Sequence, residues 1–184
     1  MANLLTLLRI LLIVPFTAAF LWDASWNMSV AFCFFAASAL TDFFDGYVAR
    51  KRNEVSALGA ALDPIADKLL VAAALFLLVR NGVVREAGVV AAIVIVLREI
   101  LVSGLREALA RRGEALAVTG LAKWKTAGQL LAVGALLAAA PGGIAGEGLR
   151  PLASGLLWLA AVLTFWTGAD YASRAAALLS RPMR

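Results

Sequence analysis

Four aspartates lie close together in an otherwise apolar chain, at positions Asp42, Asp45, Asp63 and Asp67. Each pair has the three- or four-residue spacing that places its members on one face of a helix. Carboxylates beside membrane-spanning segments are costly and repel one another, and hard divalent cations take carboxylate oxygens as ligands. The spacing therefore predicts one site that binds divalent metal.

Glycine and arginine accompany these aspartates in a fixed pattern. The pattern reads Asp42-x-x-Asp45-Gly46-x-x-Ala49-Arg50, and after a short connection Gly59-x-x-x-Asp63-x-x-x-Asp67. Glycine lets a ligand or a neighbouring helix approach closely, and the arginine fork binds anionic oxygens bidentately. The chain contains no histidine, so acid–base work falls to carboxylate, lysine or tyrosine. Two metal ions beside such an arginine indicate chemistry on a phosphorylated substrate.

This pattern resembles the signature of the CDP-alcohol phosphatidyltransferase family at every defining position. The resemblance implies a six-helix fold, two Mg²⁺ or Mn²⁺ ions, and transfer of a phosphatidyl group from a CDP-linked lipid to an alcohol, with release of CMP. It also implies the roles of individual residues. The metal ligands would be Asp42, Asp45, Asp63 and Asp67, with Asp67 also the catalytic general base, and the CDP-lipid would contact Gly46, Arg50, Ser56 and Gly59.

A second group of charged residues follows in the stretches LREILVSGLRE and LAKWKTAGQ. These stretches, and NLLTLLR near the N-terminus, resemble the bacterial phosphatidylglycerophosphate synthases of that family, although Ala122 stands where those enzymes usually have glycine. The resemblance adds Asn3 and Thr6 to the residues expected at the CDP-lipid. We expect the stretches to bind the phosphate of a glycerol 3-phosphate acceptor through the cations Arg98, Arg106, Lys123 and Lys125.

Two alternatives remain for these cations. Arg98 and Arg106 are about two helical turns apart and share a face, but they could simply pair with Glu99 and Glu107. The two lysines could simply anchor a helix at the membrane interface.

The elements that must position these residues are membrane helices. The chain has 184 residues, of which 62% are hydrophobic and 16% charged, a composition typical of a polytopic membrane protein. Apolar segments lie near 4–22, 27–44, 64–80, 87–109, 117–140 and 151–170, each close to the roughly 20 residues that cross a bilayer. We therefore predict a single all-α domain over 1–184, with six transmembrane helices around a polar cavity that faces the cytoplasm.

The distribution of basic residues predicts the orientation. With a cytoplasmic N-terminus, the outer loops hold Arg80, Arg85 and Arg150, and the inner segments hold Arg50, Lys51, Arg52, Arg106, Arg111, Arg112, Lys123, Lys125, Arg174, Arg181 and Arg184. Such a bias places both termini and the aspartates on the cytoplasmic side. We expect the protein to reside in the inner membrane of a bacterium.

Other functions remain open at this point. A sibling enzyme could use inositol phosphate, serine or phosphatidylglycerol as the acceptor, and a divalent-cation transporter could use the aspartates as its transport site. The expected partners are CDP-diacylglycerol, glycerol 3-phosphate and membrane lipid, with no nucleic acid. A homodimer stays an alternative to a single copy.

Overall fold

The structure is a computed structural model that describes residues 2–22, 24–52, 57–116 and 120–180. The side chains of 1–6, 42–61, 63–64 and 117–123 also lie outside the described set. The described chain is helical, which confirms the all-α prediction. Its helices are α1 (Ala2–Leu21), α2 (Asn27–Arg52), α3 (Ala57–Arg80), α4 (Ala87–Arg111), α5 (Gly120–Ala138), the short 3₁₀ helix η1 (Glu147–Leu149) and α6 (Arg150–Leu179).

The helices follow the predicted apolar segments, but several are longer. The α6 helix continues to Leu179, beyond the segment predicted over 151–170, because its last turns are rich in alanine and leucine, which favour a helix even where the sequence turns polar. Among the described residues, two stretches are long and apolar enough to cross a membrane, Ala87–Arg111 and Glu147–Leu179.

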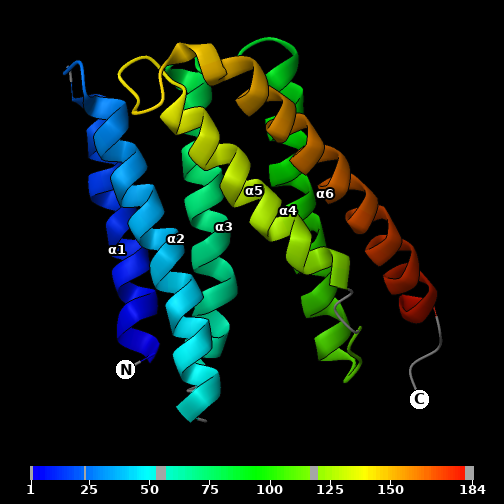
Figure 1. Cartoon of the computed structure of the whole chain (residues 1–184). Helices are drawn as coiled ribbons and strands as arrows, with labels where there is room; N and C mark the ends of the chain where they lie inside the picture. The colour runs from blue at the N-terminus through cyan, green and yellow to red at the C-terminus, as the bar shows by residue number, and fades with distance from the viewer. Residues whose placement is uncertain (1, 23, 53–56, 117–119, 181–184) are drawn as a thin grey trace.

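The helices run up and down, with the start of α1 and the end of α6, the ends of the described chain, at the same end of the bundle (Figure 1). The α1, α2 and α3 helices lie together on one side, α4 and α6 lie on the other, and α5 stands between them (Figure 1). The most extensive packing joins α6 to α4 and α5, and α1 to α2 and α3. The bundle thus consists of two helical groups joined mainly through α5.

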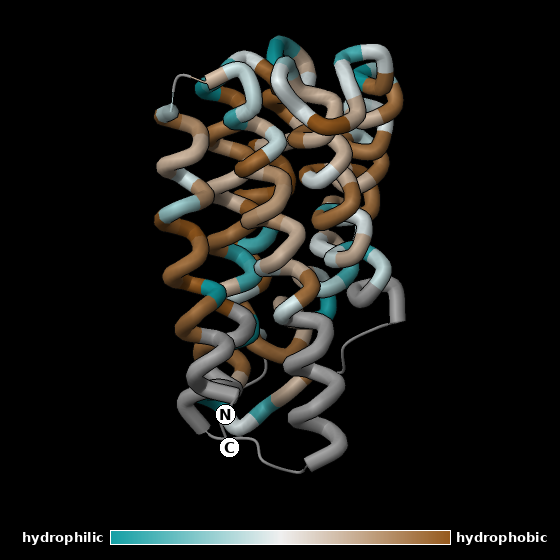
Figure 2. The backbone as a smooth tube through the Cα atoms, turned by 60° about the vertical axis from the view of Figure 1, so that its left-hand side comes forward, coloured by the Kyte–Doolittle hydropathy of each residue, from teal (hydrophilic) through white to brown (hydrophobic). Residues whose placement is uncertain are grey.

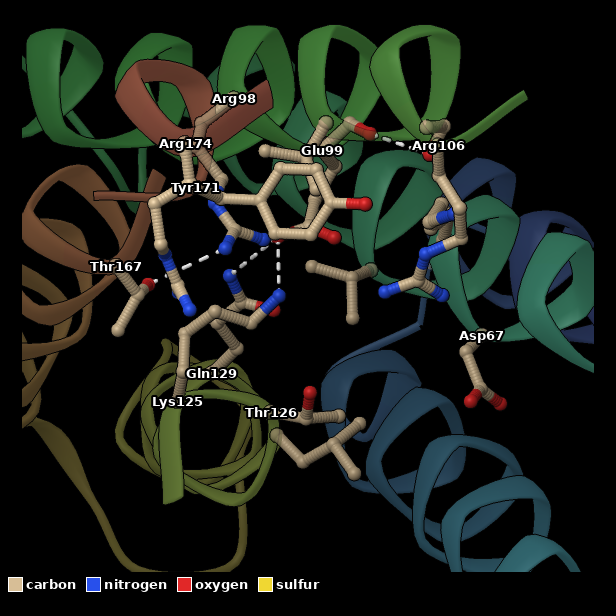
Figure 3. A pocket seen from close by; sticks show the side chains of 15 residues that line it. Asp67, Arg98, Glu99, Arg106, Lys125, Thr126, Gln129, Thr167, Tyr171 and Arg174 are labelled. Carbon is tan, nitrogen blue, oxygen red and sulfur yellow. Dashed lines mark hydrogen bonds and ion pairs between the residues drawn. The ribbon is translucent and has the colours of Figure 1, made fainter. Parts of the chain in front are cut away.

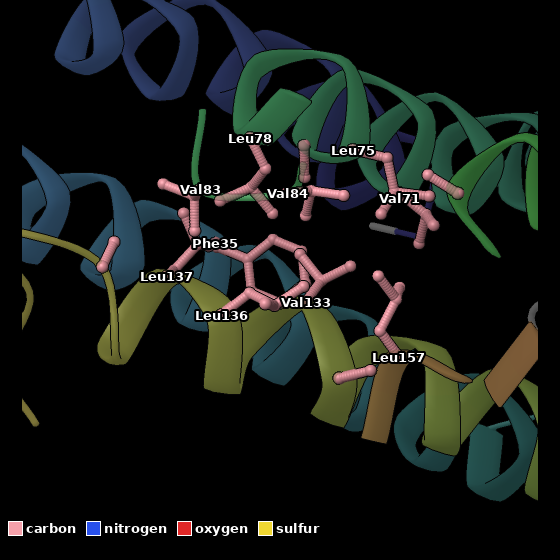
Figure 4. Close-up of a cluster of buried hydrophobic side chains, with 14 of the residues drawn as sticks. Phe35, Val71, Leu75, Leu78, Val83, Val84, Val133, Leu136, Leu137 and Leu157 are labelled. Carbon is pink, nitrogen blue, oxygen red and sulfur yellow. The ribbon is translucent and has the colours of Figure 1, made fainter. Parts of the chain in front are cut away.

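The apolar core fills the half of the bundle away from the termini. Phe35 of α2, Leu75 of α3, Leu136 of α5 and Leu157 of α6 are all buried there and meet in one cluster (Figure 4). Hydrophilic positions reappear in the half nearer the termini (Figure 2). Many large apolar side chains face outward instead, including Trp166 at 71% exposure, as expected for a surface covered by lipid.

Hydrogen bonds join the turns at the end opposite the termini. Ser29 donates from its backbone N and its Oγ to the carbonyl of Gly142, at 3.1 and 2.7 Å. Gly142 has a φ of +77°, and a Cβ there would lie 2.3 Å from the carbonyl oxygen of Ser25. Arg150 Nη2 donates to the carbonyls of Gly82 and Val83 at 2.8 and 3.0 Å. These contacts connect the α1–α2, α3–α4 and α5–α6 hairpins to one another.

Candidate active site

A pocket of about 230 Å³ opens between α3, α4, α5 and α6. Two carboxylates line it, Asp67 and Glu99. Five cationic side chains line it as well, namely Lys68 from α3, Arg98 and Arg106 from α4, Lys125 from α5 and Arg174 from α6. Since the cations outnumber the carboxylates by three, the described lining favours an anionic ligand.

Glu99 joins three helices in the wall of this pocket. Its Oε1 accepts hydrogen bonds from Arg98 Nη1 at 3.0 Å, from Gln129 Nε2 at 3.3 Å and from Lys125 Nζ. Gln129 also donates to Thr164 Oγ1 of α6 at 2.9 Å. These interactions gather on one side of the pocket (Figure 3). Because the groups are largely buried, the carboxylate compensates the charge of two cations that would otherwise be costly.

Arg98 reaches this position because α6 has a glycine, Gly168, where the arginine side chain passes it. A Cβ at Gly168 would lie 2.5 Å from Arg98 Cγ, so glycine is needed for the arginine to pass. Arg98 Nη2 then donates to Thr167 Oγ1 at 3.3 Å. The Nε of Arg98 is buried against α6 and has no hydrogen-bond partner in the described part of the chain.

Arg106 and Lys68 differ from the other cations of the pocket. Within the described residues neither makes a hydrogen bond or an ion pair through its side chain. The pairing of Arg106 with Glu107 that the sequence allowed is not found, because Glu107 accepts from Arg111 at 2.6 Å outside the pocket. Arg106 lies across the pocket from the Glu99 network, on the same side as Asp67 (Figure 3). These two cations can therefore receive an anion without breaking an existing pair.

Asp67 lies at the pocket wall and contacts the first helix. Arg9 Nη1 of α1 donates to Asp67 Oδ1 at 2.9 Å. The side chain of Arg9 is 1% exposed, and that of Asp67 is 36% exposed. The arginine is thus enclosed by protein, while the carboxylate can still be reached from the pocket. A partly exposed carboxylate beside a polar pocket suits a hard divalent cation.

The structure brings together four of the predicted site residues, namely Asp67, Arg98, Arg106 and Lys125. The others lie outside the described side chains and stay predictions; they are Asn3, Thr6, Asp42, Asp45, Gly46, Arg50, Ser56, Gly59, Asp63 and Lys123.

Several residues of the pocket were not among the predicted site residues. Lys68 directly follows Asp67, and this adjacency was a usable signal. Tyr171 and Arg174 line the pocket from the part of α6 that lies beyond the predicted apolar segment. Arg9, which contacts Asp67 from outside the pocket lining, follows Asn3 and Thr6 at three-residue spacing and shares their predicted helix face.

Comparison with known proteins identifies relatives along most of the chain. The profile of the CDP-alcohol phosphatidyltransferase family matches residues 1–166. A CDP-diacylglycerol–glycerol-3-phosphate 3-phosphatidyltransferase of Cereibacter sphaeroides is 36% identical, with 94% of each chain covered. An enzyme of the same name from Rickettsia felis is 40% identical over 92% of this chain and 91% of its own. An enzyme of that name from Arabidopsis thaliana, numbered 2, is 41% identical over 90% of this chain and 75% of its own.

The family match and the two apolar helices of spanning length indicate a membrane protein. The aspartate pattern, the helical bundle and the extent of the match agree with one another. The chain belongs to the CDP-alcohol phosphatidyltransferase family.

Proposed function

We propose that this chain transfers the phosphatidyl group of CDP-diacylglycerol to glycerol 3-phosphate, giving phosphatidylglycerophosphate and CMP. The observation that carries this proposal is a pocket lined by five cations together with Asp67, the last aspartate of the family pattern. The names of the relatives from Cereibacter sphaeroides and Rickettsia felis support the same acceptor. The enzyme is a transferase of phospholipid biosynthesis.

Arg106 and Lys68 are suited to bind the phosphate of the acceptor. They lie in the pocket with Asp67 and make no ion pair within the described residues. Glycerol 3-phosphate is a dianion, and charge-assisted hydrogen bonds from two cations would hold it firmly. Arg98 and Lys125 already pair with Glu99 and would contribute through their charge, and Lys123 is proposed to join them. Serine, with no net charge at neutral pH, gains less from these cations than a phosphate dianion does.

Asp67 is the proposed general base. It would accept the proton of the sn-1 hydroxyl of glycerol 3-phosphate as the hydroxyl oxygen forms a bond to the lipid-side phosphorus of CDP-diacylglycerol. The bond between that phosphorus and the bridging oxygen breaks, and CMP leaves. Asn3, Thr6, Gly46, Arg50, Ser56 and Gly59 would orient the CDP-lipid. Two Mg²⁺ or Mn²⁺ ions, held by Asp42, Asp45, Asp63 and Asp67, would neutralise the pyrophosphate charge.

The remaining proposals concern the setting of the enzyme. All six α-helices would cross the bacterial inner membrane as one domain, with both termini and the pocket on the cytoplasmic side. The pocket residues Asp67 and Lys125 lie in the first halves of α3 and α5, and Arg106 and Arg174 lie in the second halves of α4 and α6. These halves are nearer the end of the bundle at which α1 begins (Figure 1), as this orientation requires. A cation transporter is disfavoured, because the cations that line the pocket would repel a free metal ion.

Release of CMP by the purified protein tests this function. The assay would combine CDP-diacylglycerol with radiolabelled glycerol 3-phosphate, inositol phosphate or serine in detergent, in the presence of Mg²⁺ or Mn²⁺. We expect radiolabelled lipid product with glycerol 3-phosphate alone. Product with another acceptor and none with glycerol 3-phosphate would contradict the proposed acceptor. No CMP with any acceptor would contradict the proposed reaction.

A further inference from the structure

Arg9 is a buried cation in an apolar helix. Its neighbours along α1 are leucines and isoleucine, in the run LLRILLIV, and its side chain is 1% exposed. Enclosing a guanidinium in this way is unfavourable unless an anion and hydrogen-bond acceptors meet it. Its described partner is Asp67, with Nη1 and Oδ1 2.9 Å apart. The interaction crosses from α1 to α3, two helices that pack against each other.

The contact fixes one side of a carboxylate that reaches the pocket. Arg9 does not line the pocket, whereas Asp67 does and stays 36% exposed. The planar guanidinium donates in fixed directions, and its described hydrogen bond to Asp67 comes from Nη1. Lysine would supply the charge from a single point. The geometry therefore allows Arg9 to set the orientation of the Asp67 carboxylate without itself lining the pocket.

We propose that Arg9 is a positioning residue for the general base: it holds the carboxylate of Asp67 at the pocket wall in the orientation needed to accept the acceptor's proton. This inference rests on the proposed function, since it gives Arg9 a role only through Asp67. Arg9 itself would touch neither glycerol 3-phosphate nor CDP-diacylglycerol. Loss of the arginine should then lower turnover and leave substrate binding nearly unchanged, since a misplaced catalytic group mainly affects the chemical step.

A cycle of variants tests this role: Arg9→Gln, Asp67→Asn and the two combined. We expect Asp67→Asn to lower kcat about a hundredfold or more, as for loss of a general base. Arg9→Gln should lower kcat roughly thirtyfold or more, with both KM values within about threefold of the original. In the Asp67→Asn background, Arg9→Gln should change kcat by less than about twofold, because residues that act as a unit are not additive. Arg9→Lys should recover part of the lost turnover.

The control is Arg150→Gln, which removes the contacts to Gly82 and Val83 at the other end of the bundle. It should lower thermal stability in detergent and leave kcat unchanged. If Arg9→Gln does not fold, Arg9→Met, which also removes the charge and the donors, provides the same cycle in the original and Asp67→Asn backgrounds.

The outcomes separate the two proposals. Equal losses of kcat from the Arg9 variant in both backgrounds would overturn the positioning role and leave the proposed function intact. A rise in either KM without a fall in kcat would also overturn the positioning role and leave the proposed function intact. Near-normal turnover of Asp67→Asn would overturn the assignment of Asp67 as the base, and the role of Arg9 with it. Failure of the positioning role of Arg9 thus gives a different result from failure of the assignment of Asp67 as the base.

Discussion

Replacing Glu99 by glutamine should destabilise the wall of the pocket. The carboxylate is 13% exposed and accepts hydrogen bonds from Arg98, Gln129 and Lys125, and the lysine side chain is 6% exposed. Glutamine has nearly the same shape and keeps one acceptor oxygen, but it carries no charge. Two cations would then remain in a mostly buried site without their described counter-charge. The change therefore isolates the electrostatic contribution of Glu99 from its packing.

The expected loss follows from the cost of leaving buried charge uncompensated. Removing one partner of a buried ion pair costs about 3–5 kcal/mol. At about 2–4 °C per kcal/mol for a chain of this length, the midpoint of thermal unfolding should fall by roughly 6–20 °C. Glu107→Gln is the matched control on the same helix. Its pair with Arg111 is exposed, at 66% and 78%, and such pairs contribute no more than about 1 kcal/mol.

Thermal unfolding of the purified variants in one detergent would measure both losses. A double variant, Glu99→Gln with Lys125→Met, should regain part of the lost stability, because it removes one of the two uncompensated cations. The reasoning would be refuted if Glu99→Gln were no less stable than Glu107→Gln. The same conclusion would follow if the added Lys125→Met change lowered stability further.

Three further predictions concern the contents and shape of the pocket. Gly168→Ala should displace Arg98 and lower activity, since the new Cβ would lie 2.5 Å from Arg98 Cγ. Gly155→Ala on the same helix should not lower activity, because no atom lies within 4 Å of its Cβ. Steady-state kinetics of the two variants checks this prediction, and equal activities would contradict it. Arg106→Ala should raise the KM for glycerol 3-phosphate roughly tenfold to a hundredfold, the value of a lost charge-assisted hydrogen bond, and leave the KM for CDP-diacylglycerol unchanged. Arg111→Ala, which is paired outside the pocket, should change neither constant. Chelation of divalent metal should abolish CMP release, and added Mg²⁺ or Mn²⁺ should restore it; full activity in metal-free buffer would disprove the metal requirement.

The sequence was sufficient for the helices and for part of the pocket. Apolar segments of spanning length predicted where helices form, and two-turn spacing predicted that Arg98 and Arg106 face the same cavity, as both do. Spacing within one helix does not say which neighbouring helix supplies a partner. The meeting of Glu99 with Lys125 and the reach of Arg9 to Asp67 depend on how α1, α3, α4 and α5 pack, so these pairs could not be predicted.

The part of α6 that lines the pocket was missed for a different reason. Apolar segments were used to bound the helices, and that criterion ends α6 where its sequence turns polar. Helix propensity carries α6 further, to Leu179. Tyr171 and Arg174 thus reach the pocket from a stretch that composition alone places outside the membrane-spanning segment.

The adjacency of Arg98 and Glu99, paired at 3.0 Å, has a consequence for biosynthesis. A ribosome delivers helices in order, and an unpaired charge costs about 2.5–3.5 kcal/mol at the centre of an inserting helix. When α4 enters the membrane, α5 and its Lys125 do not yet exist, but Glu99 already has Arg98 beside it. Lys125 later meets a carboxylate that is in place, as Asp67 of α3 meets Arg9 of α1. The described pairs of Lys125 with Glu99 and of Asp67 with Arg9 therefore form only once the later helix of each pair, α5 or α3, has been made.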